Sequence, residues 1–427
     1  MIFLVACLLL VALLASGIPV AIALALAGIV AGYLLQGPAA LIMVPQVMFA
    51  GTHSFLLLAI PLFILMSEVL TRGGVGEILF ETANKWLRHL PGGLAISTVA
   101  TSAVVAGITG SSIADTATVG IVALPAMLTR GYERKFVLGL IAASGTLGIL
   151  IPPSIPMILY GAITSESVGK LFMAGLIPGL ILSILLMGYV VLVCSRGTAY
   201  QRLAPASWGE RWAQTRKGVW GLLLPPLVVG GMYAGIFTPT EAAGVGAVYA
   251  AFVSLVVLRT IGLRTLGQIL TQTLATTSMI LLITAGALVF GNVMTVLQVP
   301  QQLTQLVVDL KLPTWAFLIL VNLLLLVLGC LLEVISITFI VIPVLYPALI
   351  QLGIDPIWFA VLFVVNMQIA QITPPVGLVL YTMAAISGRP LAEVIRGVTP
   401  FIVLLIAYLA FLMLFPQLSL WLPRLVR

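Results

Sequence analysis

Two kinds of stretch place polar or helix-breaking residues inside long apolar runs. The first reads GITGSSIADTATVG over residues 107–120 and carries a carboxylate, Asp115. The second is a pair of adjacent prolines, which occurs as Pro152-Pro153 and again as Pro374-Pro375. A proline has no N–H, so each pair leaves carbonyl oxygens of the preceding turn without their helical donor. Such oxygens can hold a cation, and these stretches are therefore the candidate functional sites.

The proline pairs predict a broken helix in each half of the chain. Freed carbonyls together with nearby hydroxyls supply the oxygen ligands that a hard cation such as sodium needs. The residues expected to contribute are Gly148, Ile149 and Ser154 at the first break, and Ala370, Gln371 and Thr373 at the second.

The stretch around Asp115 predicts two short helices joined at a polar tip. Gly110, Ser111 and Ser112 can turn the chain sharply and leave hydroxyls beside a new helix N-terminus, which attracts anions. Asp115 would cost about 2.5 to 3.5 kcal/mol on a lipid-facing surface, so it must face the interior. Two interpretations stay open: Asp115 binds a ligand, or it only balances the dipole of its own half-helix. Glu333 occupies the matching place in the second half, near Gly329.

The elements around these sites belong to a membrane protein. The chain is 62% hydrophobic and 7% charged, and apolar runs of membrane-spanning length recur from end to end. Sustained alternation of apolar and polar residues is missing, which favours a helical bundle over a barrel. We interpret residues 1–16 as a retained first helix, because they lack the positive start of a secretory signal. The three cysteines show neither metal-ligand nor disulfide spacing, so no transition metal is expected.

The chain carries a distant copy of itself, at offsets between 218 and 223. The matched pairs are Pro19 with Pro239, Asp115 with Glu333, Pro125 with Pro343, Phe136 with Phe359, Pro152-Pro153 with Pro374-Pro375, Tyr160 with Tyr381, and Pro178 with Pro400. We divide the chain into repeat 1, residues 1–216, and repeat 2, residues 217–427. Repeat 1 holds a hairpin at 92–128 and a broken helix at 136–160; repeat 2 holds a hairpin at 313–350 and a broken helix at 357–381.

The number of crossings predicts that the repeats are inverted. In the first half we expect crossings near 2–16, 18–35, 54–70, 136–160 and 171–195, with an amphipathic segment at 74–89. A hairpin that enters the membrane and returns to the same side adds no net crossing. Five crossings are odd, so the second half begins on the opposite side, as in many secondary transporters.

Charge provides a second test of this topology. If the loop 196–217, which includes Arg202, is cytoplasmic, 15 of the 19 Lys and Arg residues fall inside and 4, Arg427 among them, fall outside. This satisfies the positive-inside rule and places both termini on the outer side.

Six sequence runs resemble the large membrane subunit of the tripartite ATP-independent periplasmic (TRAP) transporters. They are GSSIADTATVGIVALPAMLTRGYERKF, GTLGILIPPSIPMILYG, LFMAGLIPG, FTPTEAAGVGAVY, GIDPIWFAV and ITPPVGL. The resemblance covers essentially the whole chain. The run before Thr373 reads AQITPP, where the family often has glycine-rich sequence.

This resemblance implies a sodium-driven importer of organic acids in the bacterial or archaeal cytoplasmic membrane, working by an elevator motion without ATP or an organic cofactor. It also implies a separate small membrane subunit and a periplasmic substrate-binding protein as partners. The cation and substrate region would lie at the two hairpin tips, around 110–112 and around Gly329, and at the two breaks, 148–154 and 371–377, the last ending at Gly377.

Two other functions compete with this interpretation. A stand-alone sodium/dicarboxylate symporter would share the inverted-repeat architecture and transport without partners. An intramembrane aspartyl protease would use Asp115 and Glu333 as paired acids, but that chemistry requires two aspartates that share a proton. We therefore predict a transporter and not an enzyme.

Overall fold

The structure is a computed structural model that describes residues 1–196 and 203–425. Every regular element in these ranges is a helix, which confirms the predicted all-α class. Arg202 and Arg427, which entered the charge count, lie outside the described residues.

The helices follow one another closely, with short connections. The first half contains α1 (Ile2–Ala15), α2 (Val20–Gln36), α3 (Ala39–Thr52), η1 (Phe55–Leu58), α4 (Ala59–Arg72), α5 (Val75–Leu87), α6 (Gly93–Thr109), α7 (Ser112–Leu128), α8 (Arg134–Gly145), η2 (Thr146–Ile149), α9 (Ile155–Thr164) and α10 (Val168–Arg196). The remainder contains α11 (Trp208–Leu222), η3 (Pro226–Gly230), α12 (Gly231–Tyr233), α13 (Pro239–Phe252), η4 (Val253–Val257), α14 (Leu263–Val296), α15 (Val299–Asp309), α16 (Thr314–Gly329), α17 (Val334–Gln351), α18 (Pro356–Gln371), α19 (Leu378–Ser387), α20 (Leu391–Leu414) and α21 (Gln417–Leu425). The proposed repeat boundary after residue 216 falls inside α11.

Six helical segments are long and apolar enough to cross a membrane, in keeping with a multi-pass membrane protein. They are Phe55–Arg72, Val168–Arg196, Pro239–Val257, Leu263–Val296, Val334–Gln351 and Leu391–Leu414. Helix α3 was not among the predicted crossings. It is apolar and largely exposed, and it lies between the Gly37-Pro38 turn and the break at His53. The segment α17 is long enough to cross by itself, so its place in a re-entrant hairpin stays a prediction.

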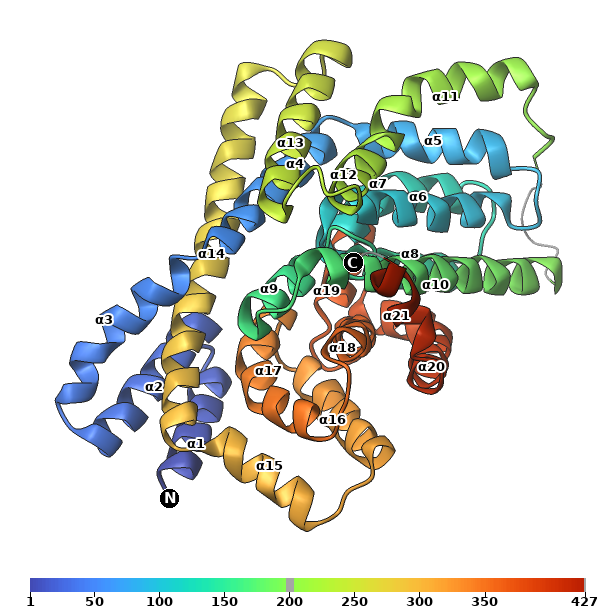
Figure 1. Ribbon diagram of the computed structural model, residues 1–427. Coiled ribbons are helices and arrows are strands. Elements are labelled where there is room, and N and C mark those ends of the chain that lie inside the picture. Colours follow the sequence, from blue (N-terminus) through green and yellow to red (C-terminus); the bar gives the residue numbers. More distant parts are fainter. Residues whose placement is uncertain (197–202, 426–427) are drawn as a thin grey trace.

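One group of helices, α1 to α4 with α13 and α14, forms a framework along one side of the molecule (Figure 1). Within it α2 packs against α14, and α4 packs against α13. Glycine makes the first crossing close, since a Cβ added at Gly28 would lie 2.8 Å from the backbone nitrogen of Phe290. Gly286 likewise lies against the Ala21 carbonyl. The framework is thus held by backbone-to-backbone packing, as is common between membrane helices.

The second group contains the two helix pairs that are predicted as hairpins, together with both interrupted helices. α6 pairs with α7 and α16 leads into α17, while α8 crosses α20 where Gly139 meets Gly397. Helix α9 packs against α17, and α19 packs against α7, so each half of the chain covers part of the other. The amphipathic helices α5 and α15, which precede the two hairpins, lie at opposite ends of the molecule (Figure 1). This arrangement brings each hairpin tip to a helix break.

Candidate functional site

At the first site, which we call junction 1, the tip between α6 and α7 meets the break between η2 and α9. The backbone N–H of Ile155 donates to the Gly110 carbonyl over 3.4 Å. A Cβ added at Gly148 would lie 2.6 Å from the Ser111 carbonyl oxygen. Gly110 also has a φ of +61°, a conformation that favours glycine. The backbones of the tip and of the break can approach this closely because Gly110 and Gly148 have no Cβ.

Serine side chains cap both helices that start at junction 1. The Oγ of Ser111 accepts from the N–H of Ala114 at the start of α7, and the Oγ of Ser154 accepts from the N–H of Met157 at the start of α9, both over 3.5 Å. Ser154 also donates to the carbonyl of Ile149. Two helix N-termini and two helix C-termini therefore meet at one buried place. Their N–H groups suit an anion and their carbonyls suit a cation.

Asp115 lies in the first turn of α7 and is 0% exposed. Neither of its carboxylate oxygens has a hydrogen-bond partner among the described residues, and the neighbouring Thr116 hydroxyl also lacks one. A buried carboxylate without a partner is costly unless a proton or a cation compensates it. Asp115 thus offers two unpaired carboxylate oxygens, which are the kind of ligand that a hard cation prefers.

At the second site, junction 2, the tip between α16 and α17 meets the break between α18 and α19. The N–H of Val376 donates to the Cys330 carbonyl over 3.1 Å, and Gly329 packs against the side chain of Ala370. Both proline pairs have a cis peptide bond. Their surroundings differ, because Pro152 and Pro153 are buried whereas Pro374 and Pro375 are exposed.

The structure corrects part of the predicted ligand set. The Ala370 carbonyl is not free, because the chain turns after α18 and the N–H of Thr373 donates to it over 3.1 Å. The Ile149 carbonyl is taken by the Ser154 hydroxyl. The carbonyls of Gly148 and Gln371 receive no hydrogen bond from the described residues.

Glu333 is not the counterpart of Asp115 in detail. It stands before the first turn of α17, at the N-cap, and its side chain makes no capping hydrogen bond. It is half-buried, whereas Asp115 is fully enclosed. The two acids therefore share a place in the sequence without sharing an environment.

Sequence reasoning missed Gln368, which connects α18 to junction 1. Its Nε2 donates to the Thr146 carbonyl in η2 over 2.8 Å, and the Ser112 hydroxyl donates to the same oxygen over 3.4 Å. The Oε1 of Gln368 has no partner among the described residues. The available signal was a group of amide side chains, Asn366, Gln368 and Gln371, in a half-helix that is otherwise almost entirely apolar. Through it, the broken helix of the second half contacts the break of the first half directly.

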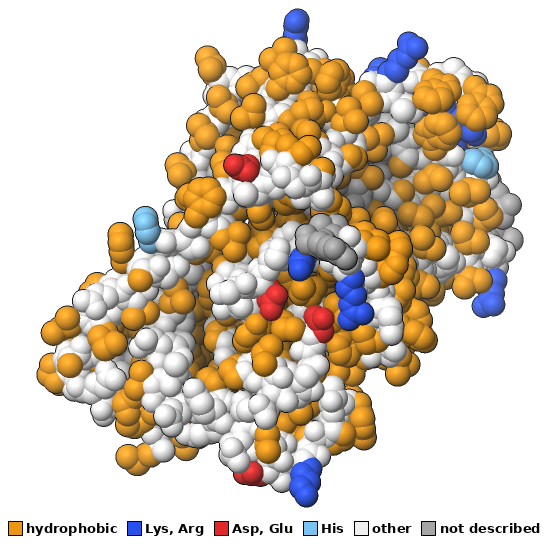
Figure 2. Space-filling model, viewed as in Figure 1, with side chains coloured by type: hydrophobic (Ala, Val, Ile, Leu, Met, Phe, Trp, Pro, Cys, Tyr) orange, Lys and Arg blue, Asp and Glu red, His pale blue; other side chains and the backbone are white. Residues whose placement is uncertain are grey.

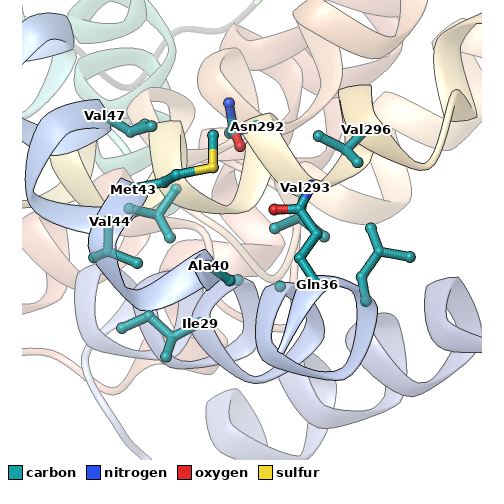
Figure 3. A pocket seen from close by; sticks show the side chains of 13 residues that line it. Ile29, Gln36, Ala40, Met43, Val44, Val47, Asn292, Val293 and Val296 are labelled. Carbon is teal, nitrogen blue, oxygen red and sulfur yellow. The ribbon is translucent and has the colours of Figure 1, made fainter. Parts of the chain in front are cut away.

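A cavity between α2, α3 and α14 lies in the framework, among helices that form neither junction (Figure 3). Its lining is mostly apolar, with Gln36 and Asn292 as the amide side chains. It offers no charged group for an organic acid, so we assign the functional site to the junctions.

The family model and the most similar relatives indicate the same protein family. The model of the "Tripartite ATP-independent periplasmic transporter, DctM component" matches residues 7–418. The "C4-dicarboxylate TRAP transporter large permease protein DctM" of Pseudomonas aeruginosa is 42% identical over 377 residues, 88% of each chain. The "Sialic acid TRAP transporter large permease protein SiaM" of Vibrio cholerae is 35% identical over 413 residues, 97% of this chain and 96% of that one.

Among solved structures, the YdaH transporter of Alcanivorax borkumensis aligns with a TM-score of 0.60 over 88% of both chains at 16% identity, which shows similarity of fold. The relatives are transport proteins, and the protein is accordingly a transporter and not an enzyme. With a family match over nearly its whole length, the chain belongs to the tripartite ATP-independent periplasmic transporters as a DctM component, the large permease.

Proposed function

We propose that this permease imports carboxylated organic acids together with sodium, and that the two junctions hold the cation and the solute. The observation that carries the proposal is junction 1, where a fully buried carboxylate without a partner lies at the meeting point of four helix ends. Sodium favours oxygen ligands of the kind that unwound helices expose. Helix N-termini at the same place favour a carboxylate solute.

The names of the relatives support the class of solute. One relative is named for C4-dicarboxylates and another for sialic acid, and both names denote acids. By the same reasoning, the solute that the present chain transports is an organic acid. Its partners are a small membrane subunit and a periplasmic substrate-binding protein, in keeping with the tripartite family. Movement of the junction helices past the framework gives an elevator-type exchange of access between the two sides.

The decisive test is uptake by purified components. The permease is reconstituted with its small subunit and with the binding protein encoded beside it, whose ligand is identified first. An inward sodium gradient is expected to drive accumulation of that ligand, while an equal potassium gradient is not. Accumulation driven equally by both ions would overturn sodium coupling.

Omitting partners separates this function from that of a stand-alone symporter. Without the binding protein, or without the small subunit, no accumulation is expected under the same sodium gradient. Robust uptake by the permease alone would instead establish the stand-alone sodium/dicarboxylate symporter.

The orientation in the inner membrane follows from the 15-to-4 charge split. Both termini face the periplasm in this proposal. In a cysteine-free version, a cysteine at Thr238 is expected to react with an impermeant thiol reagent added outside, while one at Ser387 is expected to be protected. The reverse pattern would invert the orientation.

A further inference from the structure

An apolar cavity of about 380 Å³ lies between α5, α6 and α11, outside both junctions. Its lining includes Ala83 and Trp86 of α5, Ala100 of α6, and Trp212 and Leu222 of α11. On α11 the lining runs from Trp212 to Leu222, which corresponds to about 15 Å along a helix. The lining is almost entirely hydrocarbon, which suits an acyl chain.

Basic side chains stand at one end of this cavity. The Arg211 guanidinium carbon lies 5.5 Å from the ring centre of Trp86 and 5.1 Å from that of Trp208. The Nε atoms of Arg88 and Arg211 are buried and have no hydrogen-bond partner among the described residues. Lys85 adds a third positive charge at the C-terminal end of α5. The two Nε–H groups thus lack an acceptor within the described chain.

One acid, Glu210, balances the basic end only in part. Its carboxylate lies 3.3 Å from the Lys85 Nζ and 3.6 Å from the Arg88 Nη2. The backbone N–H of Ser207 and the neighbouring Lys85 lower the pKa of Glu210, so it stays ionised at neutral pH. Three cations face one anion, which leaves a net positive charge.

The surroundings match the edge of a bilayer. Trp208 and Trp212 are 65% and 56% exposed on α11. Figure 2 shows hydrophobic side chains gathered over the part of the molecule where α5 and α11 lie, with Lys or Arg side chains beside them. Exposed indoles next to basic residues are typical of the membrane–water interface. The basic end of the cavity thus lies where phospholipid headgroups are found.

We propose that this cavity binds one anionic membrane phospholipid, with its phosphate among Lys85, Arg88 and Arg211 and an acyl chain between α5, α6 and α11. The charge selects an anionic headgroup over a zwitterionic one. The acyl chain fills space that side chains leave empty. Because α5 leads into the hairpin of junction 1, the lipid fastens the helix that introduces the transport site.

The test uses the permease with its small subunit in nanodiscs of phosphatidylcholine that contain graded amounts of phosphatidylglycerol. The acyl chains of one lipid at a time are brominated, and quenching of indole fluorescence is recorded against the fraction of that lipid. Trp86 and Trp212 line the cavity, so an occupied site gives a saturable component. We expect this component at low fractions of brominated phosphatidylglycerol and not with brominated phosphatidylcholine.

Charge variants identify the headgroup site. The double variant Arg88→Gln/Arg211→Gln is expected to shift half-saturation to a higher phosphatidylglycerol fraction, by about fivefold for each cation removed. The matched control is Arg216→Gln/Lys217→Gln, which removes two exposed cations of α11 and is expected to leave the half-saturating phosphatidylglycerol fraction unchanged.

A cavity-filling variant identifies the acyl-chain site independently. Ala83→Leu places a larger side chain on the lining and is expected to abolish the saturable component while all charges remain. The control Ala213→Leu enlarges an exposed residue of α11 and is expected to leave it intact. Copurification of the small subunit and an unchanged melting temperature show that each variant is folded.

Three outcomes would overturn the proposal. Equal saturable quenching by both lipids would mean that the basic residues select no headgroup. If brominated phosphatidylglycerol gives no saturable quenching, or if neither the charge variant nor Ala83→Leu changes that quenching, the cavity holds no lipid. A component that the permease shows alone and loses on adding the small subunit would identify that subunit, and not a lipid, as the occupant.

Discussion

Junctions 1 and 2 arise from the same pattern, a hairpin tip that meets a broken helix, yet they differ in exposure. Every residue from 137 to 161 is buried, so the first break is enclosed on all sides. The second half-helix is equally buried from 358 to 372, but the residues that follow, 373–376, are half-buried or exposed. The two incoming helices are therefore alike, and the difference begins at the second proline pair.

The hairpin tips explain this difference. Gly110, Ser111 and Ser112 are small, so tip 1 approaches the backbone of Gly148. The second tip reads Cys-Leu-Leu-Glu over 330–333, and its Leu331 is 58% exposed. Tip 2 contacts its break through one backbone hydrogen bond, from Val376 to Cys330, and through Gly329, which packs against the Ala370 side chain. Junction 1 is thus enclosed, whereas junction 2 is open at its proline pair.

Thiol labelling gives the largest contrast between the junctions. In a version that retains only the native Cys330, the thiol is expected to react with a small maleimide, because Cys330 is partly exposed. In a cysteine-free version with Ser112→Cys, a nearly isosteric change at a 1% exposed site, no reaction is expected. Mass spectrometry measures the extent of maleimide labelling in both purified versions. Equal labelling would show that junction 1 opens as readily as junction 2.

The variant Gly148→Ala is expected to abolish uptake. Its Cβ would lie 2.6 Å from the Ser111 carbonyl, and backbone cannot yield as a flexible side chain can. Overpacking of this kind costs about 1 to 3 kcal/mol and would move the tip from the break. Gly188→Ala on α10 is the control, because an added Cβ there meets nothing within 4 Å. Normal uptake by Gly148→Ala would refute the close backbone contact.

Neutralising the two acids separates their roles. Asp115→Asn is expected to raise the sodium concentration for half-maximal uptake by about 10- to 150-fold, the range for losing a charged partner. Glu333→Gln at the half-buried helix start is expected to change it by less than about fivefold. Sodium titrations of uptake at matched expression compare the two. An equal effect would mean that the acids act alike despite their surroundings.

Single hydroxyls test individual ligands at the two sites. Ser111→Ala and Thr373→Val are each expected to raise the half-maximal sodium concentration by about 5- to 150-fold without loss of the small subunit. We expect the smaller effect for Thr373→Val if the hydroxyl only donates to the Ile369 carbonyl, from which it lies 2.6 Å. Unchanged sodium dependence in both variants would make these hydroxyls structural.

The smallest expected effect concerns the bridge between the helices. Gln368→Leu removes one of the donors to the Thr146 carbonyl, while Ser112 still donates to it. A loss of about 0.5 to 1.5 kcal/mol is expected, which is about two- to twelvefold in sodium affinity if the bridge supports junction 1. Thermal unfolding and sodium titration together distinguish loss of stability from loss of binding. If neither the melting temperature nor the sodium affinity changes, the hydrogen bond from Gln368 to Thr146 is dispensable.

The sequence by itself determined the chemistry of this protein. Its apolar composition required a membrane bundle, because uncharged runs of this length are stable as spanning helices. The paired prolines required two breaks, since each proline lacks the N–H that a helix needs. The burial of Asp115 also followed from the cost of a carboxylate in lipid.

Only the tertiary structure decided which of these groups meet. Whether the carbonyls of Ile149 and Ala370 are free depends on a local hydroxyl and on a turn, neither of which the proline pattern specifies. Gln368 contacts Thr146 across 222 residues, a pairing fixed by how the two halves of the chain pack. The difference between junctions 1 and 2 likewise depends on how closely each tip can approach its break. The sizes of the side chains at the two tips can be read from the sequence, but the packing of the neighbouring helices determines the distance between each tip and its break.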